Sequence, residues 1–306
     1  MEIFQKFHRE GTEYKIWEPS LEIDGFPKSF VWSVSPKKGL SWRLKIFYKI
    51  FDPVRFSLWM GRLVCSSFSR FLIVPFVFFM GIDRKRFESK TGNDFYKNFD
   101  EFFTRRFKKM PPFYSGAAPA EGQVIYLARG KSDQMLSIKG EKVSLKDLLG
   151  KAFSYFPAEV GVVITYLSPK DYHLGHSPFA GKVVFHERIP GSAWTVAPEI
   201  WNEKDLEGFS GVHYLTLNAR DVLVKETLQG PFATVYVAAT NVFSTEMHVQ
   251  VGEEVAVGQH EQSYHLGSTN VYVFDAKQFC FPSHLFPGEQ LVFGQTPFLI
   301  PKSENL

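Results

Sequence analysis

Residues 160–168 read VGVVITYLS, a short run of mostly β-branched and aromatic residues that ends in serine. Val, Ile, Thr and Tyr favour strands, and the Gly, Pro and Asn residues between such runs favour turns. Similar runs recur along the second part of the chain: QVIYLA (123–128), GKVVFHERI (181–189), HYLTLNA (213–219), DVLVKETL (221–228), FATVYVAA (232–239) and NVYVFD (270–275). This part is therefore predicted to form an antiparallel β core, interrupted by one short helix at SLKDLLGKAF (144–153).

The first part of the chain has a different pattern. RLKIFYKIFDPVRFSLWMGRLV (43–64) and NDFYKNFDEFFTRRFKK (93–109) carry apolar residues at intervals of three and four among basic ones, which is typical of helices. The stretch MPPFYSGAAPAEG (110–122), with its Pro and Gly, marks a boundary. We therefore predict an α+β protein, with a helical, membrane-docking region at 1–110 packed on a β-rich domain at 111–306.

The composition bounds the class of protein. A chain of 306 residues with 44% hydrophobic and 22% charged residues can bury a core, which excludes an intrinsically disordered chain. Its two cysteines, Cys65 and Cys280, fit a reducing compartment and exclude a metal site built from a cysteine cluster. Its 32 Phe exceed what a core needs, so some are expected to contact lipid or a partner.

The charge is unevenly distributed. Residues 1–110 hold 21 Lys and Arg against 12 Asp and Glu, whereas residues 111–306 hold 14 against 20. Basic residues among aromatic ones suit an anionic membrane surface or a nucleic acid. The uncharged apolar run FLIVPFVFFMGI (71–82) favours the membrane, because binding to a nucleic acid gives no reason to keep it. No nucleic-acid partner is therefore expected.

The run at 71–82 contains Pro75 and is too short to cross a bilayer, which takes about 20 residues. We expect it to lie in the membrane interface, and the alternative is a buried core helix. Residues 1–15 alternate charged and apolar side chains and show no secretory signal. The predicted location is peripheral, on the cytoplasmic face of a bacterial cell membrane.

The first segment that could carry chemistry is YHLGSTNVYVFD (264–275), which places Gly267, Ser268 and Thr269 directly before a strand. Such a tripeptide is usually a turn. The functional alternative is an internal acyl shift, in which the Ser268 hydroxyl attacks the carbonyl of Gly267 and forms an ester. That reaction needs a base.

The second segment is YLSPKDYHLGHSPFAG (166–181), with His173 and His176 between two predicted strands. The Ser-Pro pairs argue against the helical turn on which two such histidines would bind zinc, and no third ligand stands at suitable spacing, so no metal is expected. Imidazoles in this setting suit general acid and base catalysis near neutral pH. The alternative is a pair of ordinary surface histidines.

The third segment is PAEG (119–122), where Glu121 stands just before a predicted strand. Most carboxylates in such turns are solvated. The functional alternative is a carboxylate that orients a histidine, as in a carboxylate, histidine and nucleophile triad.

Taken in chain order, these segments resemble the phosphatidylserine decarboxylases, a family of self-processing enzymes that carry a pyruvoyl group. The similarity extends from about residue 70 through most of the chain. Other similar segments are FLIVPFVFFMGIDRKRFE (71–88), NFDEFFTRRFK (98–108), SLKDLLG (144–150), LNARDVL (217–223) and AATNVFS (238–244). The histidine motif and LGST (266–269) are the specific ones.

The resemblance implies a role for each residue. Ser268 would attack Gly267, and β-elimination from the ester would leave a pyruvoyl group at position 268. The precursor would separate into a β chain, 1–267, and an α chain, 268–306. His176 would be the base that deprotonates Ser268, with Glu121 as its orienting carboxylate. His173 would serve the decarboxylation.

The resemblance also implies the reaction and the partners. The pyruvoyl carbonyl would condense with the serine headgroup of phosphatidylserine as a Schiff base and accept the electrons left when carbon dioxide departs. The product would be phosphatidylethanolamine, with no pyridoxal phosphate and no metal. The substrate would stay in an anionic membrane, and a homodimer is implied.

Two departures from the family pattern stand out. Glu121 replaces the usual Asp, and the Asn-Glu-Arg segment becomes Asn218-Ala219-Arg220. They motivate an alternative from another class, a relative with the same fold that binds anionic lipid without processing itself. A third hypothesis, a serine hydrolase that uses Ser268, lacks the Gly-x-Ser-x-Gly turn.

Overall fold

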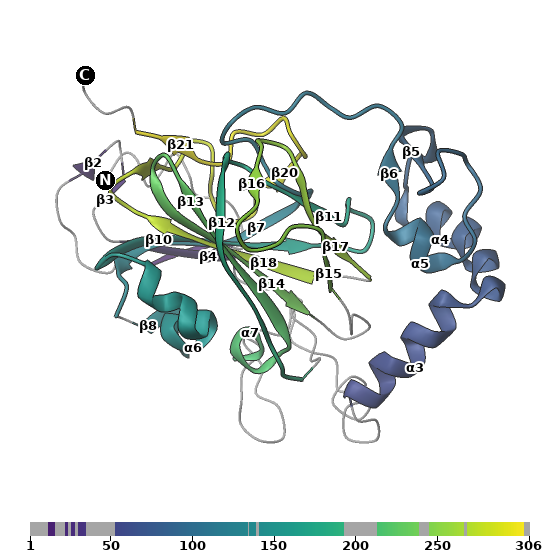
Figure 1. Cartoon of the computed structure of the whole chain (residues 1–306), viewed down its shortest axis with the longest axis horizontal. Helices are drawn as coiled ribbons and strands as arrows, with labels where there is room; N and C mark the ends of the chain where they lie inside the picture. The colour runs from purple at the N-terminus through teal and green to yellow at the C-terminus, as the bar shows by residue number, and fades with distance from the viewer. Residues whose placement is uncertain are drawn as a thin grey trace.

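The computed structural model describes the backbone of 12–15, 22–23, 26–27, 30–34, 53–133, 135–138, 141–192, 213–238, 245–265 and 268–302. A ten-stranded antiparallel sheet dominates it (Figure 1). Its strand order is β1 (Thr12–Lys15), β4 (Phe30–Val34), β7 (Gly122–Lys131), β10 (Glu159–Leu167), β18 (Ser268–Asp275), β14 (Gly230–Ala238), β13 (Arg220–Thr227), β12 (Gly181–Ile189) and β16 (Glu254–Val255), and β20 (Gln290–Leu291) also pairs with β7.

Strand β18 lies inside this sheet, between β10 and β14. Its side chains alternate between two hydrophobic clusters: Val271 and Val273 pack into one, and Tyr272 and Phe274 into the other. Because successive side chains of a strand point to opposite faces, both faces of the sheet are covered here. The residues after position 268 are thus built into the core.

A smaller sheet joins β11 (Leu174–His176), β17 (His260–Tyr264) and β15 (Thr245–Met247). It holds the histidine motif against the segment that leads to position 267. Four strand pairs complete the description: β2 (Glu22–Ile23) with β3 (Phe26–Pro27), β5 (Phe87–Glu88) with β6 (Arg106–Phe107), β8 (Met135–Ile138) with β9 (Glu141–Ser144), and β19 (Phe279–Cys280) with β21 (Ile300–Pro301).

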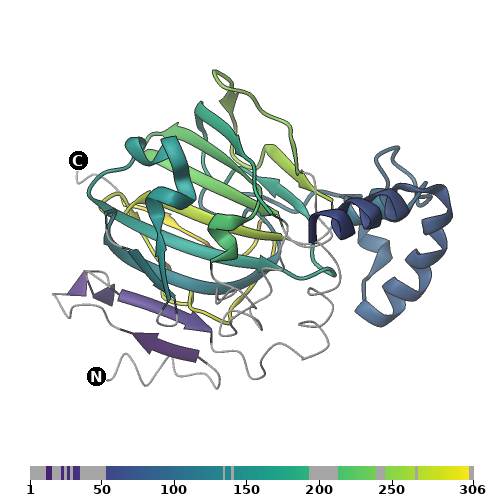
Figure 2. The same ribbon diagram turned by 90° about the horizontal axis from the view of Figure 1, so that it is seen from below.

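The helical segments α3 (Pro53–Cys65), η1 (Ser67–Leu72), α4 (Ile73–Met80) and α5 (Phe99–Phe103) group at one end of the molecule (Figure 2). A third hydrophobic cluster joins them to the β part, since Val64, Ile73 and Phe102 pack in it with Leu167 and Tyr264. The short helices η2 (Arg84–Arg86), α6 (Leu145–Leu149), η3 (Gly150–Tyr155) and α7 (Tyr214–Leu217) complete the list.

The α+β class and most of the predicted elements are confirmed. The strands predicted at 123–128, 160–168, 181–189, 221–228, 232–239 and 270–275 appear as β7, β10, β12, β13, β14 and β18, and the helix predicted at 144–153 appears as α6 and η3. Each of these strands is bounded by turn residues, so local pattern and tertiary structure agree.

The strand predicted at 213–219 is wrong, because this segment forms helix α7. The guanidinium of Arg220 donates hydrogen bonds to the carbonyls of Thr216 (2.6 Å) and Asn218 (3.0 Å) at the end of that helix. It also donates to the carbonyls of Leu148 (2.9 Å) and Asp147 (2.6 Å). Together, these local and tertiary contacts outweigh the strand propensity of Tyr, Leu and Thr.

The prediction of a helical region at 1–110 is wrong for 12–15 and 30–34, where β1 and β4 extend the main sheet and Phe30 pairs with Arg129. The run FVWSV at β4 carried a strand signal that the basic character of the region obscured. The helix predicted at 93–109 is also shorter. It starts after Asn98, whose side chain accepts a hydrogen bond from the Glu101 amide (2.9 Å), and β6 follows at Arg106.

Candidate functional site

The fold brings the two histidines and the segment before position 267 together. In the small sheet Leu174 pairs with Ser263, and the Tyr264 amide donates to the His173 carbonyl (3.0 Å). Strand β18 then begins at Ser268, whose backbone lies between Leu167 of β10 and Ala238 of β14. Leu167 ends the strand from which the histidine segment continues, so both segments meet at one edge of the core.

The side chain of Ser268 and the whole of Gly267 lie outside the described residues. Only the backbone of Ser268 is described, and it shows that the predicted cleavage bond, between Gly267 and Ser268, directly precedes β18. On its far side, the Tyr264 hydroxyl donates to the Asn270 side-chain oxygen, and the Asn270 amide donates to the Tyr272 hydroxyl (2.8 Å). These buried contacts link the chain on both sides of the cleavage point.

His173 is completely buried and its protonation state follows from its contacts. Its Nδ1 lies 2.8 Å from the Asp171 carbonyl, which can only accept, so Nδ1 carries the hydrogen. Its Nε2 is buried with no hydrogen-bond partner among the described residues. Burial, and secondly the charge of Arg105, lowers the pKa of His173 to about 3. At neutral pH the ring is a neutral imidazole whose Nε2 lone pair is available.

Arg105 holds the His173 segment in place. Its buried guanidinium donates to the carbonyls of Lys170 and Asp171, each at 2.7 Å, and lies over the Phe87 and Phe102 rings. The Asp171 carbonyl thus binds both Arg105 and His173. Arg105 was not predicted as a functional residue, although it lies in the Phe-Phe-Thr-Arg stretch of the family-like segment 98–108.

His176 is also buried and neutral. Its Nδ1 lies 2.8 Å from the Gly258 carbonyl and therefore carries the hydrogen, while its Nε2 accepts from the Tyr172 hydroxyl (3.0 Å). Burial lowers its pKa to about 4. The Phe293 ring packs on it, with ring centroids 4.6 Å apart. An imidazole with this tautomer and pKa can act as a base at Nε2 over the whole neutral range.

Glu121 was predicted to orient His176, but its carboxylate contacts other groups. Its Oε1 accepts from Arg86 (3.1 Å) and its Oε2 accepts from the Tyr172 amide (3.0 Å). Both ring nitrogens of His176 have other partners, so in this structure the carboxylate reaches His176 only through Tyr172. Tyr172, which the sequence analysis did not select, therefore links the two residues.

A buried polar network braces the residue after His176. Lys225 donates to Glu261 (2.5 Å) and to the Ser177 hydroxyl, and the Tyr236 hydroxyl donates to the second oxygen of Glu261 (3.1 Å). Burial lowers the pKa of Lys225, and the opposed charge of Glu261 counteracts this effect. Removing one partner of such a pair typically costs about 3–5 kcal/mol, so the network fixes β11 relative to β13 and β17.

No group of three or more His, Cys, Asp or Glu within the described residues is arranged to hold a metal ion. A different kind of surface is found on the helical part. Seven large apolar side chains of η1 and α4 are exposed to solvent. We call them the apolar ridge: Phe68, Phe71, Leu72, Val74, Phe78, Phe79 and Met80. Phe78 and Phe79 are each 80% exposed. This contradicts the alternative of a buried core helix at 71–82.

Basic residues follow the apolar ridge directly. A cavity of about 210 Å³ lies beyond the end of α4 and is lined by Arg84, Lys85, Phe87, Asp94, Tyr96 and Lys108. Of the helices in the described ranges, none alone has the length and apolar composition to cross a membrane. The segments Trp59–Cys65 and Ser67–Met80 pass that test only together, as a pair bent by 78°.

Comparison with known proteins shows that the chain is similar to carboxy-lyases that are made as proenzymes. The family model described as phosphatidylserine decarboxylase matches residues 99–298. A phosphatidylserine decarboxylase proenzyme of Nitrosococcus oceani is 33% identical over 221 residues, which are 63% of this chain and 69% of the relative. A phosphatidylserine decarboxylase proenzyme of Psychromonas ingrahamii is 29% identical over 266 residues, which are 77% of this chain and 90% of the relative. This chain therefore belongs to the phosphatidylserine decarboxylase family.

Proposed function

We propose that this chain cuts itself between Gly267 and Ser268, forms a pyruvoyl group at position 268, and then decarboxylates phosphatidylserine to phosphatidylethanolamine. The observation that carries the proposal is that β11, the strand of the histidine segment, pairs with β17, which leads to position 267, in a chain of this family, and that both histidines are buried. An internal serine needs a base to react, and we assign that role to His176 and assign His173 to the decarboxylation.

In the first reaction His176 Nε2 takes the Ser268 hydroxyl proton while that oxygen bonds to the Gly267 carbonyl carbon. The peptide C–N bond then breaks as the proton passes from His176 to the departing nitrogen. Loss of the Ser268 α-proton from the resulting ester then expels the Gly267 carboxylate. Water replaces the nitrogen of residue 268, which leaves as ammonia. Tyr172, which donates to His176 Nε2, has to release that atom before the proton can move.

In the second reaction a pyruvoyl carbonyl would supply an electrophile for the substrate amine and an electron sink for the carbanion. The chemistry of the residues fits such a group, because His173 Nε2 is a buried polar atom without a partner among the described residues, and the His173 carbonyl bonds to the strand that leads to position 267. An unsatisfied buried polar atom is unfavourable by about 1–3 kcal/mol and so favours a polar occupant. The Nε2 atom of His173 is unprotonated, because Nδ1 carries the hydrogen. His173 must therefore accept a proton at Nε2 before it can donate one to the substrate carbon.

The substrate's acyl chains place the site at a membrane surface. The apolar ridge supports docking in the interface, and Arg84 and Lys85, which follow it in the chain, support contact with anionic headgroups. A position on the cytoplasmic face and a homodimer come from the sequence analysis alone, and both stay predictions.

The proposal is tested on the purified chain by denaturing gel and intact mass. We expect one fragment that ends at Gly267 and a second that begins at residue 268 and is one ammonia lighter than a hydrolysis product. Borohydride added with phosphatidylserine should trap an adduct on the smaller fragment. A chain that stays intact through prolonged incubation but binds phosphatidylserine vesicles would instead support the non-processing relative.

Membrane docking gives a separate prediction. Replacing Phe78 and Phe79 together by serine should weaken binding to phosphatidylserine vesicles by at least about 10-fold, since burying one Phe contributes about 1.5–3 kcal/mol. Co-sedimentation measures the binding. Leu228→Ser is the control, because Leu228 is 97% exposed on the turn between β13 and β14, away from the helices. Equal losses for both variants would contradict docking through the ridge.

A further inference from the structure

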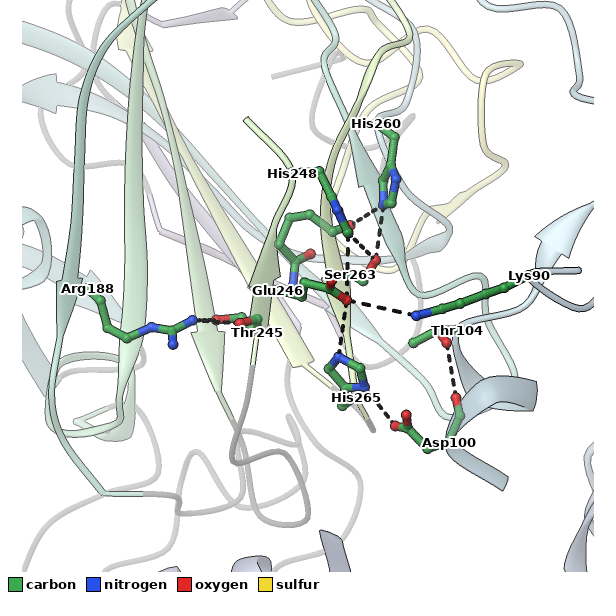
Figure 3. Close-up of polar contacts among 11 residues, drawn as sticks. Lys90, Asp100, Thr104, Arg188, Thr245, Glu246, His248, His260, Ser263 and His265 are labelled. Atoms are coloured by element: carbon green, nitrogen blue, oxygen red, sulfur yellow. Dashed lines mark hydrogen bonds and ion pairs between the residues drawn. The ribbon is translucent and has the colours of Figure 1, made fainter. Parts of the chain in front are cut away.

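His265 stands two residues before Gly267, and two carboxylates hold its side chain (Figure 3). Its Nδ1 lies 2.8 Å from Asp100 Oδ1, and its Nε2 lies 3.8 Å from Glu246 Oε2. The His265 and Asp100 side chains are only 22% and 14% exposed, whereas Glu246 is 50% exposed. The contact with Asp100 is therefore the stronger one, being shorter and better shielded from solvent.

Asp100 is itself firmly placed on α5. The Thr104 amide and hydroxyl both donate to the Asp100 carbonyl, at 3.0 and 3.1 Å. Phe99 and Phe102 bury that helix in the third hydrophobic cluster, and the Phe99 amide donates to Ser69 of η1 (2.9 Å). A carboxylate on such an element can fix the position of its partner.

The same short helix also reaches the histidine segment. The Phe103 ring lies 4.1 Å, centroid to centroid, from His173, and Arg105 just beyond the helix binds the Asp171 carbonyl. Helix α5 and the residues after it therefore touch both segments that have to meet for self-cleavage: the one that ends at Gly267 and the one that carries the imidazoles.

We infer that Asp100 and His265 are positioning residues for self-cleavage, an inference that rests on the proposed function. Four residues separate His265, which Asp100 holds, from Asn270 in β18, a strand that pairs with β10 and β14. Anchoring both ends of so short a segment restricts how the Gly267 carbonyl is presented to the Ser268 hydroxyl. Misplacing a reacting group by about 1 Å can slow a reaction on the order of 100-fold.

The test is the first-order rate of self-cleavage of freshly purified precursor, followed by denaturing gel in the absence of lipid. Asp100→Ala and His265→Ala should each slow cleavage by about 10- to 100-fold. The double variant should be no slower than the slower single variant, because both changes remove one interaction. Asp100→Asn, whose amide oxygen can still accept from Nδ1, should recover most of the rate.

Glu101→Ala is the matched control. It removes the adjacent carboxylate of α5, which accepts from the Lys97 amide and makes no contact with His265. We expect its cleavage rate to stay within about twofold of the parent rate, as for an independent surface site. If Glu101→Ala slowed cleavage as much as Asp100→Ala, the effect would belong to helix stability and the inference would be wrong.

The outcomes separate the two proposals. If the parent chain never cuts, the proposed function fails and this inference fails with it. If the parent chain cuts and both Asp100→Ala and His265→Ala cut at the parent rate, only the positioning role is lost. Thermal unfolding of each variant checks folding, and His265→Ala, which leaves α5 intact, carries the test should Asp100→Ala not fold.

Discussion

A Ser268→Ala chain is expected to remain one polypeptide under conditions in which the parent chain separates into two. Without the hydroxyl no ester can form at Gly267, and hydrolysis of an ordinary peptide bond does not replace that step on a laboratory timescale. The fold should be unaffected, because position 268 enters β18 through backbone pairing with Leu167 and Ala238, which alanine retains. Decarboxylase activity should fall to background with the cleavage.

Denaturing gels and intact mass measure this result. Ser263→Ala is the control, since Ser263 is a nearby serine of β17 whose hydroxyl contacts His248 and His260. It should cut like the parent chain. Cleavage of the Ser268→Ala chain at the same bond would show that Ser268 is not the nucleophile.

The second large effect is expected at His176. Replacing it by alanine removes the proposed base and should slow self-cleavage by about 10²- to 10⁴-fold, the usual contribution of general base catalysis. His248→Ala removes another imidazole of the same region that bonds to Ser263, and it should cut within about twofold of the parent rate. Gel densitometry over time gives both rates.

The pH dependence of the parent chain tests the same assignment. Burial lowers the pKa of His176 to about 4, so its neutral, proton-accepting form persists down to that pH. The cleavage rate should therefore rise with pH through about 4 and be level from about pH 6 to about pH 8. An imidazole with the ordinary pKa of about 6.5 would instead lose rate steadily below neutrality. A midpoint near the ordinary value would mean that another group, or an exposed histidine, is the base.

The strands were predictable because their pattern is local. The runs at β10 and β18 are rich in β-branched and aromatic residues and end at turn residues, so their signal needs no knowledge of the rest of the chain. Helix α7 was not predictable in this way, because Arg220, which follows it, also bonds to the carbonyls of Asp147 and Leu148 in α6, far away in the sequence. Contacts of this kind appear in the sequence only as one arginine among many.

The candidate site shows the same division. The spacing of His173 and His176 and the position of Ser268 are visible in the sequence, but the tautomers are not, since each depends on a carbonyl that folding brings to Nδ1. The assignment of Glu121 to His176 overlooked Tyr172, which occupies the space between them. Nothing in the local sequence around Lys225 and Glu261 predicts that folding buries their side chains as a pair.

The interior place of β18 bears on how such a protein can come into being. The segment that would become the small chain supplies a middle strand of the main sheet, and Phe279, Phe281, Leu285, Phe298 and Leu299 further along it are buried in the core. Translation as two separate pieces would leave the larger one with an open seam between β10 and β14. If the chain cuts itself as proposed, it therefore has to fold before the cut, and the new terminus at position 268 arises between β10 and β14.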